Sequence, residues 1–108
     1  MIVSNKSFSE KVWAVTAKIP PGRVATYGDI AGRLANKDSA PAYRAVGMAL
    51  HRNPRAPVVP CHRVVGSDGR LTGYAGGLAK KKRMLEAEGV AVVDGRVDLS
   101  AYRWQNRR

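Results

Sequence analysis

The sequence predicts a small α/β domain that is mostly helical, with a helix-turn-helix in a winged-helix-like setting and short β-hairpins. Three observations lead to this fold class. The chain has 108 residues, which is the size of one domain. Apolar residues recur at helical spacing in its first half, whereas glycine and proline turns divide its second half into short segments. We therefore expect a single domain over residues 1–108, with no companion domain before it.

Two capping boxes predict where the first two helices begin. Ser7 is followed three residues later by Glu10 and then by an apolar stripe, which the Pro-Pro-Gly run at residues 20–22 ends. Thr26 and Asp29 give the same signal for a shorter second helix. The stripe of the first helix consists of Phe8, Val12, Val15 and Ile19.

A third helix is expected at about residues 42–52, after a turn-rich stretch at residues 36–41. The pair Asn53-Pro54 should end it, because the residue before a proline avoids helical geometry. Two short helices joined by a turn are typical of a helix-turn-helix. Arg44 and Arg52 on the second of them favour contact with nucleic acid.

The second half should hold shorter elements. Residues 54–60 are expected to be extended and irregular, and residues 63–65 to form a strand. A glycine-rich loop at residues 73–77 precedes a fourth helix at about residues 78–88, which Gly89 should end from the C′ position.

Three further features follow that loop. The basic run at residues 80–83 is expected to be a solvated face of the fourth helix. Residues 90–99 read as a hairpin around Asp94-Gly95. Tyr102 and Trp104 in the tail should pack on the domain.

The charge balance predicts a polyanionic partner. Lys and Arg number 19 and Asp and Glu number 8, so the formal net charge is +11. Nucleic acid is the first candidate for such a basic chain. The alternative is a generally basic, soluble protein, for instance a ribosome-associated one.

The cysteine count and the hydropathy pattern indicate the compartment. The chain has one cysteine, so no intramolecular disulfide can form, and His51 and His62 lack zinc-ligand spacing. It shows no signal-peptide stretch and no run long enough to span a membrane. We expect a cytoplasmic protein (associated with the nucleoid in a prokaryote, nuclear in a eukaryote) with no membrane contact, metal or cofactor.

The neighbours of Cys61 favour a reactive thiol. A lone cysteine is more often a small buried hydrophobe than a nucleophile. Pro60 restricts the backbone before this cysteine, and His62 supplies a base that titrates near neutral pH. Arg63 adds positive potential that would favour the thiolate. In an extended segment adjacent side chains point to opposite sides, so His62 would act on Cys61 through a water.

Six short segments between about residue 8 and residue 90 form a pattern. They are Pro21-Gly22-Arg23-Val24 with Thr26-Tyr27-Gly28, Arg44-Ala45-Val46-Gly47, Arg52-Asn53-Pro54, Pro60-Cys61-His62-Arg63-Val64, Gly73-Tyr74-Ala75-Gly76-Gly77-Leu78 and Glu86-Ala87-Glu88-Gly89. On these segments the chain resembles the C-terminal, active domain of the O6-alkylguanine-DNA alkyltransferases, also called methylated-DNA–protein-cysteine methyltransferases. The Pro-Cys-His-Arg-Val run is highly specific when a Gly-Tyr-x-Gly-Gly loop follows at this distance.

The resemblance implies a DNA repair reaction that moves the alkyl group of O6-alkylguanine irreversibly to Cys61, without cofactor or metal. His62 would take the thiol proton through a water, and Glu88 would orient that histidine. Asn53 would hold the turn around the active-site segment. Tyr27 would donate a hydrogen bond toward the guanine as it leaves.

The resemblance also implies how double-stranded DNA is bound. The helix-turn-helix would enter the minor groove, the damaged base would flip out, and Arg44 would fill the gap. The carbonyls of Cys61 and Val64 would accept from the guanine amino group. The family has a serine at the position of Ala75. Alanine keeps the backbone N–H, so a backbone donor near O6 would still be present. The implied DNA-binding residues are Arg44, Tyr27, Ala45 and Gly47, and the implied pocket residues are Val64, Tyr74 and Ala75.

Two other functions remain open. The chain is also similar to the alkyltransferase-like proteins, whose C-terminal segments resemble Val97-Asp98-Leu99-Ser100 followed by Tyr102 and Trp104. Those proteins bind O6-alkylguanine without removing the alkyl group, usually carry tryptophan or alanine in place of the cysteine, and recruit nucleotide excision repair proteins. Since Cys61 is retained, we favour alkyl transfer by a monomer. The third function is a DNA-binding architectural module with an inert cysteine.

Overall fold

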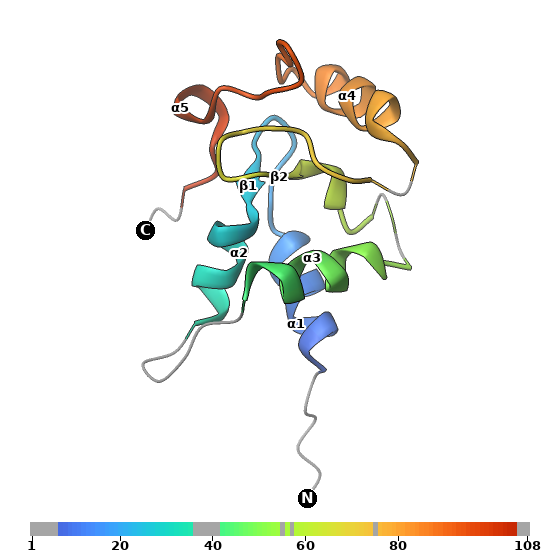
Figure 1. The fold of residues 1–108 in the computed structure, drawn as a ribbon, viewed down its shortest axis with the longest axis vertical. Helices are drawn as coiled ribbons and strands as arrows, with labels where there is room; N and C mark the ends of the chain where they lie inside the picture. Colours follow the sequence, from blue (N-terminus) through green and yellow to red (C-terminus); the bar gives the residue numbers. More distant parts are fainter. Residues whose placement is uncertain (1–6, 36–41, 55, 57, 75, 106–108) are drawn as a thin grey trace, which may run out of the picture.

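The computed structural model describes residues 7–35, 42–54, 56, 58–74 and 76–105, and it confirms a mostly helical domain with a short two-stranded sheet (Figure 1). Within these residues no helix is long and apolar enough to cross a membrane. The predicted turn at residues 36–41 and the pocket residue Ala75 lie outside the described residues. The elements are α1 (Phe8–Thr16), β1 (Ala25–Thr26), α2 (Tyr27–Leu34), α3 (Tyr43–His51), the 3-10 turn η1 (Cys61–Arg63), β2 (Val64–Val65), α4 (Leu78–Ala87) and α5 (Leu99–Tyr102).

Both predicted capping boxes are confirmed. The Glu10 backbone donates to Ser7 Oγ at 3.2 Å, and the Ser7 backbone donates back to Glu10 Oε1 at 2.9 Å. Thr26 and Asp29 exchange the same pair of hydrogen bonds at the start of α2, at 2.9 and 3.0 Å. These reciprocal bonds satisfy backbone N–H groups that a helix start would otherwise leave without partners. They therefore fix where Tyr27, the first residue of α2, enters the fold.

The sheet is a parallel pair between segments far apart in the sequence. Ala25 pairs with Val64 and Thr26 with Val65. Strand β1 was not predicted, because two residues are too few to show a period of their own. The strand near residues 63–65 is confirmed, although it starts at Val64.

The sheet separates two hydrophobic clusters, because alternate residues of a strand point to opposite faces. Ala25 and Val64 belong to the cluster formed with α1, α2 and α3, whereas Val24 and Val65 belong to the one beneath α4 and the C-terminal segments (Figure 1). The first cluster comprises Val12, Ile19, Ala25, Ile30, Ala31, Val46, Ala49, Leu50 and Val64, and the second comprises Val24, Val65, Leu71, Leu85, Val90, Val92 and Val97.

The segment that carries Cys61 differs from its prediction. It is not extended through His62 but forms the single turn η1, in which the Arg63 backbone donates to the Pro60 carbonyl at 2.9 Å. The turn then runs directly into β2. Cys61 packs against the cluster formed with α1, α2 and α3.

The C-terminal turns follow the glycines. Gly89 has a φ of 89°, and Val90 N–H donates to the Leu85 carbonyl at 3.0 Å, which is the Schellman end that the sequence predicts for α4. Asp94 and Gly95, with φ of 52° and 74°, form the predicted tight turn. Helix α5 was not predicted.

The tail packs as expected. Tyr102 contacts the second cluster and Trp104 the first. The Tyr102 carbonyl accepts from Val24 N–H at 2.9 Å, and Trp104 N–H donates to the Val24 carbonyl at 2.6 Å. The tail therefore runs beside the segment that leads into α2.

Candidate active site

A cavity of about 500 Å³ opens between α2, α3, η1 and the glycine-rich loop, and Cys61 lies in its wall. Cys61 is partly exposed, whereas its neighbours Pro60 and His62 are buried. The thiol can therefore meet a ligand that fills the cavity. The lining residues are Tyr27, Gly47, Leu50, His51, Asn53, Ala56, Cys61, Gly73, Tyr74, Gly76 and Lys80.

The Val59 carbonyl fixes the backbone segment just before Cys61 by accepting two hydrogen bonds. The Asn53 side chain donates to the Val59 carbonyl at 2.8 Å, and the Cys61 backbone N–H donates to the same oxygen at 2.8 Å. Asn53 follows α3 and lines the cavity. It therefore ties the end of α3 to the turn that carries the cysteine.

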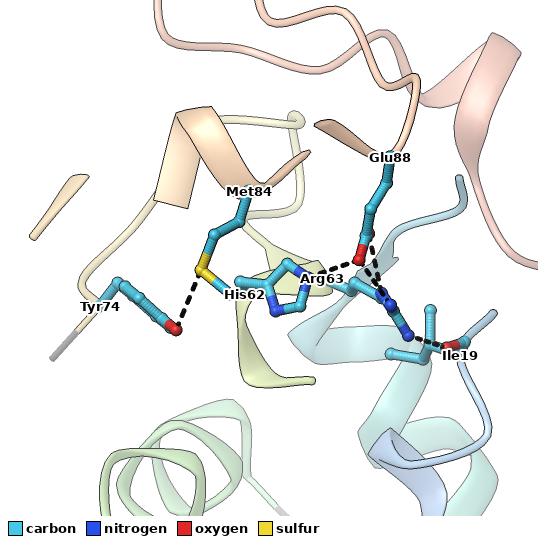
Figure 2. Close-up of polar contacts among 6 residues, drawn as sticks. All are labelled: Ile19, His62, Arg63, Tyr74, Met84 and Glu88. Carbon is cyan, nitrogen blue, oxygen red and sulfur yellow. Dashed lines mark hydrogen bonds and ion pairs between the residues drawn. The ribbon is translucent and has the colours of Figure 1, made fainter. Parts of the chain in front are cut away.

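His62, Arg63 and Glu88 form one partly buried network (Figure 2). His62 is 2% exposed, and its Nε2 lies 3.0 Å from Glu88 Oε2. Arg63 donates to both oxygens of the same carboxylate, from Nε at 2.9 Å and from Nη2 at 2.5 Å. Glu88 caps the C-terminus of α4, so the Schellman turn at Gly89 helps to place its carboxylate.

The pKa shifts in this network define the protonation of His62. Burial raises the pKa of the Glu88 carboxyl, but the hydrogen bonds from Arg63 and His62 outweigh it and hold that pKa below its usual value. Burial lowers the pKa of the His62 imidazole, and the Glu88 carboxylate opposes this only in part. A neutral imidazole beside an ionised carboxylate must donate from Nε2, because a carboxylate can only accept.

The second nitrogen of His62 is then a lone-pair acceptor. His62 Nδ1 is buried, and no described residue hydrogen-bonds to it. A neutral histidine with a free Nδ1 and an Nε2–H held by a carboxylate is oriented as a general base. The contact between His62 and Glu88 fits the roles that the resemblance implied for these two residues, which remain predictions.

The expectation for Arg63 needs correction. Its guanidinium was expected to favour the Cys61 thiolate, but it is directed at Glu88 and at the Ile19 carbonyl, to which Nη1 donates at 2.8 Å (Figure 2). Arg63 therefore acts on the carboxylate behind the histidine and anchors it to the segment after α1.

Lys81 was expected on a solvated face and is buried instead. It is 1% exposed, whereas the other members of the run, Lys80, Lys82 and Arg83, are exposed. Burial lowers the pKa of its ammonium to about 8, although the nearby Cys61 opposes the shift. The one sequence signal for this was its position, three and four residues from Leu78 and Leu85, on the apolar side of α4.

Tyrosines form two walls of the cavity. Tyr27 Oη lies 2.6 Å from Thr72 Oγ1, and Tyr74 Oη donates to Met84 Sδ at 3.3 Å (Figure 2 shows the latter). Burial raises the pKa of the Tyr74 phenol, and Cys61 adds to the rise. The raised pKa keeps the Tyr74 phenol neutral at ordinary pH, and both tyrosines line the same cavity as Cys61.

This cavity, with a cysteine in its wall and a histidine–glutamate pair behind it, lies within the part of the chain that matches known proteins. Residues 7–90 match the family model described as 6-O-methylguanine DNA methyltransferase, DNA binding domain. The chain belongs to this family. Its tail after residue 90 lies beyond the match.

Relatives of this methyltransferase family share much of the sequence. A methylated-DNA–protein-cysteine methyltransferase from Methanosarcina mazei is 52% identical over 81 residues, covering 75% of this chain and 49% of the relative. One from Mycobacterium tuberculosis is 46% identical over 81 residues, covering 75% and 47%. The chain thus spans about half the length of the curated relatives it matches.

Two crystal structures are similar in fold. OGT of Mycobacterium tuberculosis in complex with DNA is 42% identical with a TM-score of 0.72, covering 82% of this chain and 52% of that one. S. pombe Atl1 in complex with damaged DNA containing O6-carboxymethylguanine is 30% identical with a TM-score of 0.80, covering 96% and 100%.

Of the remaining family positions, three lie on α3, and Val64 lies in β2 outside the residues that line the cavity. Arg44 is exposed on the first turn of α3, and Ala45 and Gly47 on the same helix are half-buried. A Cβ at Gly47 would stand 3.8 Å from Tyr27 Cε1, so α3 lies close to the tyrosine wall there. Val64 is fully buried in β2, and its carbonyl accepts from Lys81 Nζ at 2.7 Å. Among the described residues no cluster of three or more His, Cys, Asp or Glu could hold a metal ion.

Proposed function

We propose that this protein repairs double-stranded DNA by moving the alkyl group of O6-alkylguanine to its own Cys61. One observation carries the proposal: a partly exposed cysteine lines the cavity, while the adjacent buried histidine is neutral and held by a carboxylate. The relatives named for this reaction support it. The site residues assigned from the sequence have the roles described below.

The chemistry is a displacement at the alkyl carbon. His62 Nδ1 takes the Cys61 proton through a water, and the charge that develops on the imidazole is balanced by Glu88. The thiolate sulfur forms a bond to the alkyl carbon as the bond from that carbon to O6 breaks. The electron pair stays on the guanine, which takes up a proton to become an unmodified base. Tyr27, which lines the cavity, donates a hydrogen bond to the departing ring, and Tyr74 closes the pocket.

Access to the lesion requires base flipping. An alkyl carbon on O6 inside a stacked duplex cannot be approached in line by a thiolate in a protein cavity, so the nucleotide must turn out of the helix at a cost of a few kcal/mol. The exposed Arg44 on α3 would enter the duplex from the minor groove and take the place of the base. Minor-groove readout is degenerate, which suits a protein that must recognise a lesion in any sequence.

The reaction should occur once per molecule. The product is a thioether, and its sulfur has no simple route back to a thiolate. A duplex with one O6-methylguanine should therefore add the mass of one methylene to the intact protein, mapped to the peptide that contains Cys61, with a yield that stops at one equivalent. Cys61→Ser should bind the duplex but gain no mass, because a serine hydroxyl has a far higher pKa than a thiol.

A second function, lesion recognition without transfer, is favoured by one observation. The match to S. pombe Atl1 covers 100% of the Atl1 chain and 96% of this chain. It therefore extends into the tail of this chain after residue 90, which the family model does not match. In that case the wild-type protein would bind methylated duplex tightly while the methyl group stays on guanine, and its partners would be nucleotide excision repair proteins. The mass measurement decides between the two functions.

A further inference from the structure

We infer that Thr72 is a positioning residue that holds the Tyr27 phenol ready to donate to the guanine that leaves Cys61. The inference rests on the proposed function and adds to it a residue outside the set assigned from the sequence. Its basis is the 2.6 Å contact between Tyr27 Oη and Thr72 Oγ1, which joins the first residue of α2 to the segment before the glycine-rich loop.

Thr72 can hold the phenol because its own backbone is fixed. Lys81 Nζ donates to the Thr72 carbonyl at 3.0 Å and to the Val64 carbonyl at 2.7 Å, and Lys81 is 1% exposed. One buried ammonium thereby clamps the Thr72 segment to β2. Tyr27 is fixed from the other side by the capping box that starts α2.

The hydroxyl protons of Tyr27 and Thr72 allow Thr72 to act as a hydrogen-bond donor to the phenol. Each hydroxyl carries one proton, and in this contact either oxygen can be the donor. When Tyr27 donates to guanine, its oxygen can still accept, and the Thr72 hydroxyl is in place to donate to it. This bond orients the phenol and strengthens it as a donor, because hydrogen bonds in a chain polarise one another. Valine has the same shape as threonine but cannot donate.

The test is the single-turnover rate of methyl transfer from a duplex that contains O6-methylguanine. Thr72→Val should slow transfer about 3- to 10-fold, the size expected for one neutral hydrogen bond. Thr72→Ser keeps the hydroxyl and should stay within about twofold of the wild-type rate. In a Tyr27→Phe background Thr72→Val should cause no further loss, because the two residues then no longer interact.

Two controls separate positioning from folding. Thr16 is a buried threonine whose Oγ1 donates to the Val12 carbonyl at 2.7 Å within α1, so Thr16→Val should lower thermal stability without slowing transfer. Alkylation of Cys61 by iodoacetamide needs no guanine, so it should be unchanged in Thr72→Val.

The inference is overturned if Thr72→Val transfers at the wild-type rate, if Thr72→Ser is as slow as Thr72→Val, or if the loss persists in the Tyr27→Phe background. Those results, with a wild-type protein that transfers, would leave the proposed function intact. If the wild-type protein transfers no methyl group, both the proposed function and the inference about Thr72 are wrong.

Discussion

Lys81 Nζ donates at 2.7 Å to the carbonyl of Val64, the β2 residue that pairs with Ala25. A buried ammonium is costly unless its donors are satisfied, and here a second donor reaches the Thr72 carbonyl. The thiolate form of Cys61 would raise the pKa of this ammonium and so oppose the effect of burial. Lys81 thus links the backbone of β2 to the electrostatic environment of Cys61.

The stability of the protein should depend on pH through Lys81. The pKa of its ammonium in the folded protein is about 8, below its ordinary value of 10.5, so between these values the unfolded chain binds a proton that the folded chain has released. Folding is therefore favoured as pH rises through this window. Relative to Lys81→Met, the wild-type free energy of unfolding should increase by about 2 kcal/mol between about pH 7.5 and about pH 10.

Chemical denaturation at several pH values measures this difference. Lys82→Met, which changes an exposed member of the same run, should show the wild-type pH dependence. If the free energies of unfolding of Lys81→Met and wild type differ by a constant amount across this pH range, the ammonium is not buried as described.

Glu88→Gln should slow methyl transfer about 10- to 100-fold. This is the loss of rate expected when a general base is less well oriented and its charge is less well balanced. The amide keeps the size of the side chain but could not balance the imidazolium that the proposed proton transfer from Cys61 to His62 would form. It also lets the pKa of His62 fall further, because the carboxylate is what opposes the effect of burial.

Affinity for undamaged duplex should remain within about twofold in Glu88→Gln, because the partly buried carboxylate lies among His62 and Arg63 and not on α3. Glu86→Gln changes an exposed acid on the last turn of α4 and serves as the matched variant. Transfer at the same rate in both variants would assign Glu88 a purely structural role.

Arg103→Ala should weaken the fold slightly by releasing the tail from α2. Arg103 donates to both oxygens of Asp29, at 3.0 and 2.6 Å, and the guanidinium is largely exposed, so the loss should be about 0.5 kcal/mol. Burial raises the pKa of the Asp29 carboxyl, but hydrogen bonds from Arg103 and Thr26 hold it below its usual value. The pair therefore contributes above the ordinary pKa of 3.8, and its contribution is lost as pH falls through the lower folded value.

Thermal melts at neutral pH and in acid test this dependence. Arg96→Ala, whose guanidinium lies 3.8 Å from Asp68, should change neither melt appreciably. If Arg103→Ala loses as much thermal stability in strong acid as at neutral pH, the Arg103 side chain stabilises the tail by contacts other than its ion pair with Asp29.

Much of this fold could be predicted because its signals are local. The capping boxes at Ser7 and Thr26, the Schellman glycine Gly89 and the tight turn at Asp94-Gly95 each depend on residues within one turn of each other. The candidate site could be proposed from the sequence for a different reason. Its residues lie in short segments that resemble a family, although the chain brings Glu88 to His62 from another element.

The features that were missed depend on contacts between distant segments. The pairing of Ala25 with Val64 has no local pattern, and the contact of Tyr27 with Thr72 joins residues 45 positions apart. Lys81 was misjudged because a run of four basic residues indicates a solvated face, while the helix turns one of them inward. Arg63 was assigned by its nearness to Cys61 in sequence, yet its guanidinium reaches the other way to Glu88.

Arg44→Ala should separate base flipping from chemistry. Arg44 is exposed on the first turn of α3 and is not among the residues that line the cavity, so its effect on the thiol should be small. Transfer from a methylated duplex should slow by at least about tenfold, because part of the cost of unstacking the base, a few kcal/mol, would no longer be recovered. Transfer from free O6-benzylguanine, which needs no flipping, should stay within about twofold of wild type. Lys11→Ala, an exposed charge on α1, should leave both rates unchanged and so controls for the loss of one positive charge. Equal losses on duplex and free base would show instead that Arg44 supports the cavity, since only a group that acts on the duplex can distinguish the two substrates.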